Sequence, residues 1–249
     1  MNKRIISLLM SGLFVLGLTA CGNAQASGAS ENTQAQASTA AETELNTETK
    51  DEESSVETGT EQATDGKSLV VYFSVPETTT PDNMSAEEEY STVVIDGEVL
   101  GNTQYVAHVI QENTGADIFH IEPVTPYPMN HAELEEVATE EKRNNAMPEI
   151  VAEIENLEQY TTIFLGYPNW YGDMPRIIYS FLEQYDLSGK TIAPFVTSGG
   201  SGFSNTINTI ADLEPNATVI TDGYSVNRNK VQDAEQEIIA WVNDLGYSN

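Results

Sequence analysis

The 249-residue sequence predicts a doubly wound α/β fold over residues 68–249, preceded by two segments of other kinds. Three observations lead to this fold class. Apolar runs rich in β-forming residues alternate with segments of helical spacing, as in parallel sheets with crossover helices. The first run, at residues 69–73, is continuously apolar, as in strands buried on both faces. About 180 residues is the length of one domain. We therefore expect a five-stranded parallel sheet with helices on both faces.

The five expected strands are short runs rich in β-forming residues. The first reads Leu-Val-Val-Tyr-Phe and contains no charged residue, and the third reads Thr-Ile-Phe-Leu-Gly. In chain order, the strands are expected at residues 69–73, 117–121, 162–166, 191–196 and 217–220. Ligands in such folds bind beyond the carboxyl ends of the strands, at the point where the strand order reverses. Functional residues are therefore expected in the loops after strands one, three and four.

The five expected helices follow from apolar residues that recur with a helical period. In the first helix, Val106, Val109 and Ile110 share one face. The third begins with Pro175, which the first turn of a helix accepts. The last helix carries an apolar stripe that includes Ile238. The helices are expected at residues 102–112, at 132–157 with an interruption near Pro148, and at 175–185, 204–213 and 231–245.

The first 21 residues have the pattern of a secretory signal. Lys3 and Arg4 precede an apolar stretch at residues 5–18, which is shorter than the ~20 residues that a bilayer span needs and is typical of a signal peptide. The ending Leu-Thr-Ala-Cys resembles the lipobox of bacterial lipoproteins, which implies cleavage before Cys21 and a lipid on its sulfur. We expect an extracytoplasmic protein that Cys21 anchors to the bacterial cell membrane. The alternative is an ordinary signal peptide with a chance cysteine.

Cys21 is the only cysteine in the sequence. If it carries a lipid, the mature chain has no free thiol. Disulfides, thiolate metal sites, iron–sulfur clusters and cysteine nucleophiles are then excluded. Any redox chemistry must therefore come from a bound cofactor.

The two parts of the chain after Cys21 are both acidic. Residues 22–67 consist mainly of Ala, Ser, Thr, Gln and Glu and contain no aromatic residue, so we expect a disordered acidic linker between lipid and domain. Residues 68–249 contain 29 acidic and 6 basic residues. This charge argues against nucleic acid as a partner of the domain. It is compatible with a basic partner protein, or simply with solubility.

Three loops at the expected strand ends carry the most distinctive motifs. The first strand continues into Ser74, and the first helix is entered through Gly-Asn-Thr at residues 101–103. Strand three leads into Gly-Tyr-Pro-Asn-Trp-Tyr-Gly-Asp-Met-Pro at residues 166–175, and strand four into Thr-Ser-Gly-Gly-Ser-Gly-Phe at residues 197–203. These loops resemble those of the flavodoxin family, in particular proteins with a Gly-Tyr-Pro-x-Trp-x-Gly-x-x-Pro loop. The resemblance implies a flavodoxin-like strand order of 2-1-3-4-5, bound FMN, and electron transfer with an unidentified redox partner protein.

The residue types in these loops suit FMN. Its phosphate needs N–H groups and hydroxyls at a helix N-terminus, and its ring needs flat apolar walls. Glycines allow the backbone to approach the ring edge closely. The ring is expected between Trp170, with Tyr167 or Tyr171, and the loop at residues 198–203. The expected FMN-binding residues are Ser74, Gly101, Asn102, Thr103, Tyr167, Pro168, Asn169, Trp170, Tyr171, Gly172, Thr197, Ser198, Gly199, Gly200, Gly202 and Phe203.

The chain departs from the flavodoxin pattern by an insertion at residues 75–100, which splits the phosphate loop between Ser74 and Gly101. Its last part reads as a β-hairpin around Asp96-Gly97, a favoured two-residue turn. A hairpin leaves and returns at nearly one point, so the two halves of the phosphate loop can still meet beneath it. Hydroxyls at residues 78–80 are candidates for added phosphate contacts. The acidic residues 87–89 must then point away from the phosphate.

We expect several other residues to have structural roles. The three histidines, His108, His120 and His131, have no metal-ligand spacing, and Arg176 is expected to be structural. Two further functions remain open beside an FMN electron carrier. One is a small FMN-dependent reductase, and the other is a flavodoxin-fold binding lipoprotein that no longer binds FMN. The split phosphate loop is the reason for considering a lipoprotein that no longer binds FMN.

Overall fold

Strand β5 (Tyr160–Pro168) lies at the centre of the parallel sheet in the computed structural model, which describes residues 66–247. On one side of it lie β1 (Lys67–Tyr72) and then β4 (Asp117–His120). On the other side lies β6 (Thr191–Ser198). The fifth position is shared by two short strands, β7 (Thr218–Val219) and β8 (Tyr224–Asn227), both parallel to β6. The predicted fold class and strand order are confirmed.

The divided fifth strand differs from the prediction of one strand at residues 217–220. β7 pairs with the start of β6, whereas β8, which the sequence analysis missed, pairs with residues 195–198. The break lies beside Pro194, which has no N–H to donate to a neighbouring strand. Gly223 approaches this point so closely that a Cβ on it would lie 2.6 Å from the Pro194 carbonyl oxygen. β8 carries the chain to the carboxyl edge of the sheet.

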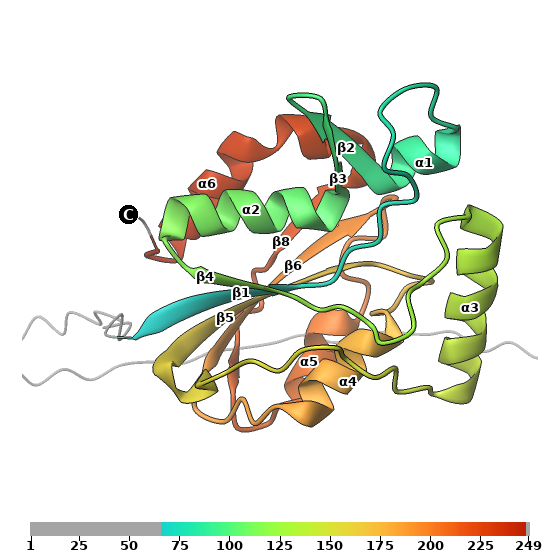
Figure 1. The fold of residues 1–249 in the computed structure, drawn as a ribbon. Coiled ribbons are helices and arrows are strands. Elements are labelled where there is room, and N and C mark those ends of the chain that lie inside the picture. The colour runs from blue at the N-terminus through green and yellow to red at the C-terminus, as the bar shows by residue number, and fades with distance from the viewer. Residues whose placement is uncertain (1–65, 248–249) are drawn as a thin grey trace, which may run out of the picture. The chain divides into compact units, whose positions relative to one another are not determined.

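Helices cover both faces of the sheet (Figure 1). On one face, α2 (Asn102–Thr114) and α6 (Glu235–Asp244) pack with strand residues such as Val70 and Phe164. On the other, α4 (Arg176–Gln184) and α5 (Thr206–Leu213) pack with Val71 and Leu165. Successive residues of each strand therefore enter opposite cores, as expected for a doubly wound sheet.

The long helix expected at residues 132–157 is shorter than predicted. Helix α3 spans His131–Asn144 and ends at Asn145, whose φ of 48° is in the left-handed region typical of a helix end. Beyond it the chain runs beside residues 122–124, where Val151 N–H donates to the Glu122 carbonyl at 2.9 Å. A 3₁₀ turn, η1 (Leu157–Gln159), then enters β5. The last predicted helix is also divided, into the 3₁₀ segment η2 (Arg228–Asp233) and α6.

The insertion contains the predicted hairpin and one unpredicted helix. Strands β2 (Thr92–Ile95) and β3 (Glu98–Gly101) pair antiparallel around Asp96 and Gly97, which both have positive φ. Helix α1 (Ala86–Ser91) precedes them. It begins with a capping box, because Ser85 Oγ accepts from Glu88 N–H and Glu88 Oε2 accepts from Ser85 N–H. The Ser-x-x-Glu spacing is a sequence signal that could have predicted it.

The predicted signal segment, Cys21 and residues 22–65 of the linker lie outside the described residues. Within residues 66–247, no helix is both long and apolar enough to cross a membrane.

Candidate cofactor site

Loops from four strand ends and the start of α2 enclose a cavity of about 140 Å³ at the carboxyl edge of the sheet. The structure brings together residues that are up to 154 positions apart in the sequence, from Ser74 to Arg228. Nine of the predicted cofactor residues line it, namely Ser74, Asn102, Thr103, Pro168, Asn169, Trp170, Thr197, Ser198 and Gly199. The remaining predicted residues do not line this cavity.

The two halves of the split phosphate loop meet at Gly101. This residue precedes α2 directly, and a Cβ on it would lie 2.1 Å from Ser74 Oγ. Only a glycine leaves room for the Ser74 hydroxyl there. The insertion therefore leaves and re-enters the sheet edge at one point, so the N-terminus of α2 faces the end of β1 as it would without an insertion.

We expect Gly101→Ala to destabilise the domain by about 1–3 kcal/mol, the usual cost of overpacking. The added Cβ and Ser74 Oγ cannot both keep their positions. Urea unfolding of Gly101→Ala, Ser74→Gly and the double variant measures the coupling. The Ser74→Gly change should recover most of the loss caused by Gly101→Ala, whereas strictly additive losses would contradict this contact.

The first turn of α2 is tied to the end of β6. Thr103 Oγ1 and Thr197 Oγ1 form a buried hydrogen bond of 2.8 Å. Asn102 donates through Nδ2 to the Tyr90 carbonyl at 2.8 Å, which fixes the orientation of its amide. Its Oδ1 is buried and has no hydrogen-bond partner, although the residue is only 4% exposed. An unpartnered buried acceptor in a cavity wall indicates a missing donor.

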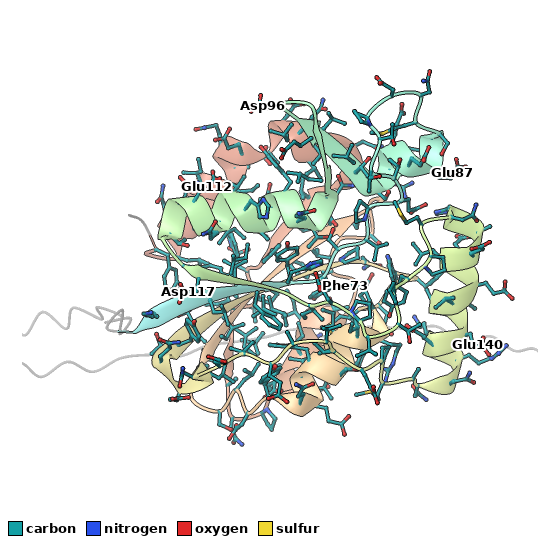
Figure 2. The ribbon with its side chains drawn as sticks, in the orientation of Figure 1. Phe73, Glu87, Asp96, Glu112, Asp117 and Glu140 are labelled. Atoms are coloured by element: carbon teal, nitrogen blue, oxygen red, sulfur yellow. The ribbon has the colours of Figure 1, made fainter. Side chains whose placement is uncertain are left out.

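Trp170 is held in the cavity wall by a tight turn and by aromatic neighbours. Trp170 and Asp173 exchange backbone hydrogen bonds of 2.9 and 3.1 Å across Tyr171 and Gly172, which both have positive φ. The half-buried indole packs edge-to-face on Phe73, with ring centroids 5.5 Å apart. Figure 2 shows Phe73 deep inside the domain. Gly172 thus has a turn-forming role.

A second cavity of about 220 Å³ adjoins the first, since both are lined by Trp170, His131 and Asn169. Tyr171 is 51% exposed and lines only the second cavity. Each cavity is smaller than the ~300 Å³ at which ligand pockets usually begin. A ligand of FMN's size would therefore have to extend from the first cavity into the second.

Two of the aromatic residues expected as ring walls lie in the core instead. Tyr167 is fully buried on β5, and its hydroxyl donates to Thr206 Oγ1 at 2.8 Å. Phe203 packs against the core on the α4 and α5 side. The alternation along β5 explains the position of Tyr167, because Ile163 and Leu165 enter the same core.

The glycine loop after β6 uses its backbone donors within the loop itself. Ser198 Oγ accepts from Gly202 N–H at 2.9 Å and from Gly200 N–H at 3.2 Å. Gly200 has a φ of 133° and Gly202 a φ of 55°, which explains why both are glycines. Asn169 joins this loop to the one after β5, since its Nδ2 donates to the Gly202 carbonyl at 2.7 Å. Of the three glycines, only Gly199 lines the cavity.

Seven cavity residues were missed by the sequence analysis: Val75, Glu77, Tyr90 and Ser91 from the insertion, His131 and Leu134 from α3, and Arg228 from η2. Glu77 Oε2 and His131 Nδ1 are 2.8 Å apart, within hydrogen-bond distance. No acidic partner pattern in the sequence indicated this contact of His131. Burial raises the pKa of the Glu77 carboxyl, and the nearby His131 only partly opposes this effect. No local motif marks this pair, which joins residues 54 positions apart.

The hydroxyls at residues 78–80 do not line the cavity, contrary to expectation. Thr78 Oγ1 instead accepts from Thr80 N–H at 3.2 Å. The acidic residues 87–89 do not line it either, and Figure 2 shows Glu87 at the outer end of the domain. Arg176 is structural as predicted, because its Nε donates to the Ala146 carbonyl at 2.8 Å. No group of acidic, histidine or cysteine residues within residues 66–247 has the arrangement of a metal site.

A sequence model of the flavodoxin family matches residues 91–245, which is more than half of the chain. The chain belongs to the flavodoxin family. The match begins inside the insertion and includes the start of α2, the loops after β5 and β6, and Arg228. Family membership and the cavity together support FMN as the cofactor of this flavodoxin.

Two solved structures share both sequence and fold with this flavodoxin. A candidate flavoprotein from Bacteroides eggerthii is 27% identical, with a TM-score of 0.53, over 73% of this chain and 98% of the other. A candidate flavoprotein from Bacteroides uniformis is 25% identical, also with a TM-score of 0.53, over 72% and 98%. A flavoprotein from Lactobacillus acidophilus in complex with FMN is 19% identical, with a TM-score of 0.48, over 69% and 99%. No curated protein matches the chain.

Proposed function

We propose that this domain binds FMN and transfers electrons between redox partners, with the phosphate at the N-terminus of α2 and the ring against Trp170. The observation that carries the proposal is the cavity where Ser74, the first turn of α2, Thr197 and Trp170 meet. It has an anion-attracting helix end and hydroxyl groups at one side. It has a half-buried indole at the other. This is the distribution of polar and apolar groups that FMN requires.

Two buried atoms support the fit of a polar ligand. Asn102 Oδ1 is an acceptor without a donor, and Arg228 Nε is a donor without an acceptor. Both residues line the same cavity. A ligand that carries hydroxyls as well as an anionic group satisfies both atoms, as the ribityl phosphate of FMN does.

Bound FMN supplies the redox chemistry, while the protein binds and orients it and limits its contact with water. The Glu77 carboxylate would oppose added negative charge on the flavin and so lower its reduction potential, to the extent that it is ionised. An electron carrier is favoured over a nicotinamide-dependent reductase, because among residues 66–247 Arg228 is the only Lys or Arg whose side chain lines this cavity. The phosphates of a nicotinamide cofactor usually require more basic groups.

Anaerobic mixing of the FMN-loaded protein with NADH or NADPH separates the two activities. A carrier should keep its flavin absorbance for many minutes with either nucleotide and lose it on addition of a chemical reductant. Rapid bleaching by NADH or NADPH would establish the reductase function instead. The redox partner is expected to be basic at its contact surface, since residues 68–249 contain 29 acidic and 6 basic residues.

The localisation is a separate part of the proposal. The lipobox motif at residues 18–21 supports a lipid on Cys21 and an extracytoplasmic, membrane-anchored protein. A single change, Cys21→Ala, should move most of the protein from the membrane fraction to the soluble fraction, or leave it as an unprocessed precursor. Fractionation and mass measurement test this. Mature-sized protein that stays firmly in the membrane fraction would refute lipid anchoring at Cys21.

A further inference from the structure

Arg228 lies in the cavity wall with its guanidinium between the insertion and the loop after β6. It follows β8 directly. Its Cζ lies 4.0 Å from the centroid of the Tyr90 ring. The same atom lies 3.4 Å from the position that a Cβ on Gly199 would take. Stacking on an aromatic ring fixes the plane of a guanidinium, which is a geometry suited to directed hydrogen bonds.

The charge of Arg228 has no carboxylate partner. Among residues 66–247, no Asp or Glu oxygen lies within 4.0 Å of its guanidinium nitrogens, although the domain is strongly acidic. Its Nε is buried and makes no hydrogen bond. Arginine stays charged at all physiological pH values, and a buried unsatisfied charged donor is costly. Such a side chain in a cavity wall indicates an anionic ligand.

The chemistry around Arg228 narrows the class of anion. Asn102 is 4% exposed, and its unpartnered Oδ1 is an acceptor that a hydroxyl can satisfy. The helix α2 begins at this residue, and its N-terminus attracts negative charge. A phosphomonoester of a polyol has both the anion and the hydroxyls that these groups require.

We propose that Arg228 is a phosphate-binding residue of this site, which distinguishes FMN from unphosphorylated riboflavin. The insertion separates Ser74 from Gly101, so the short loop that normally wraps a phosphate between these positions is absent. Arg228 replaces some of the hydrogen-bond donors of that loop, and Tyr90 from the insertion holds the guanidinium in place. The insertion therefore removes one set of phosphate contacts and positions another. This inference rests on the proposed FMN function.

Titration of the purified full-length protein with FMN and with riboflavin tests the proposal. A charged hydrogen bond contributes enough to change affinity about tenfold or more. Arg228→Gln should therefore raise the Kd for FMN about tenfold or more and leave the Kd for riboflavin within about twofold. Arg143→Gln, which removes the same charge from an exposed side chain on α3, should change neither. Equal weakening of both flavins, or no change in either, would overturn the assignment.

Two further measurements keep the test decisive. Arg228→Lys retains the positive charge, so it should keep part of the preference for FMN; a loss as large as that of Arg228→Gln would indicate a packing role instead. Inorganic phosphate probes the site without a flavin. It should raise the unfolding temperature of the wild type and not of Arg228→Gln. If wild type binds neither flavin, the proposed function fails, and this phosphate comparison alone supports or overturns the role of Arg228.

Discussion

Replacing Trp170 with alanine is expected to weaken FMN binding about tenfold or more. A base stacked on an aromatic side chain typically contributes about 1–3 kcal/mol, and flavin is a larger ring. Trp170 lines both adjoining cavities, and the turn that carries it is fixed by the backbone bonds to Asp173. Removing the indole leaves the phosphate contacts intact but removes the apolar wall. Fluorescence titration with FMN measures the loss.

A matched control separates stacking from general damage to the loop. Trp170 also packs on Phe73 and Tyr127, with ring centroids 5.5 Å apart in both pairs. Trp170→Ala should therefore lower stability as well, whereas Trp170→Phe keeps an aromatic face. We expect Trp170→Phe to retain most of the affinity. If Trp170→Ala binds FMN as tightly as wild type and quenches its fluorescence equally, Trp170 has only a structural role.

Gly166→Ala is expected to destabilise the domain by about 3 kcal/mol or more, beyond the usual upper range for overpacking. Gly166 pairs with Phe195 across β5 and β6. A Cβ on Gly166 would lie 2.0 Å from Cζ of the Phe195 ring. Phe195 is fully buried, so its ring cannot turn into solvent. For a domain of this size the midpoint should fall by roughly 6–12 °C.

Thermal unfolding of two further variants gives the comparison. Gly199→Ala adds the same methyl group where the nearest atom is 3.4 Å away, at the end of an arginine side chain. It should cost little in the protein without FMN. Adding Phe195→Leu to Gly166→Ala should recover part of the stability, because the clashing ring is gone. A drop of only one or two degrees for Gly166→Ala would contradict the close packing of these strands.

The sequence predicted the fold well because three of its strands, β1, β5 and β6, are largely buried on both faces. A continuous apolar run such as residues 69–73 indicates a strand of this kind directly, because both of its faces are buried and no core-facing side has to be chosen. The loop motifs then predicted the edge of the sheet where the cavity lies. β8 was missed because it is only four residues long, and its run Tyr-Ser-Val-Asn carries little apolar signal.

The sequence was less informative about individual side chains. Tyr167 belongs to the same motif as Trp170, yet it lies inside β5 and points into the core. A motif gives the loop, and only the strand alternation gives the side on which each residue lies. Arg228 and Glu77 were missed for another reason. Arg228 reaches the cavity from a distant segment that no spacing rule connects to the phosphate loop. Glu77 lies only three positions after Ser74, but it belongs to the insertion, which has no counterpart in the flavodoxin pattern.

The most direct test of this account is a titration of the purified full-length protein with FMN. Binding is measured through the quenching of the flavin fluorescence. The account predicts saturable binding of one FMN per chain, with strong quenching because the ring contacts Trp170. Flavin that stays fully fluorescent at every ratio, with no change in absorbance, would contradict it. The domain would then be a flavodoxin fold that has lost its cofactor, and its cavity would serve another ligand.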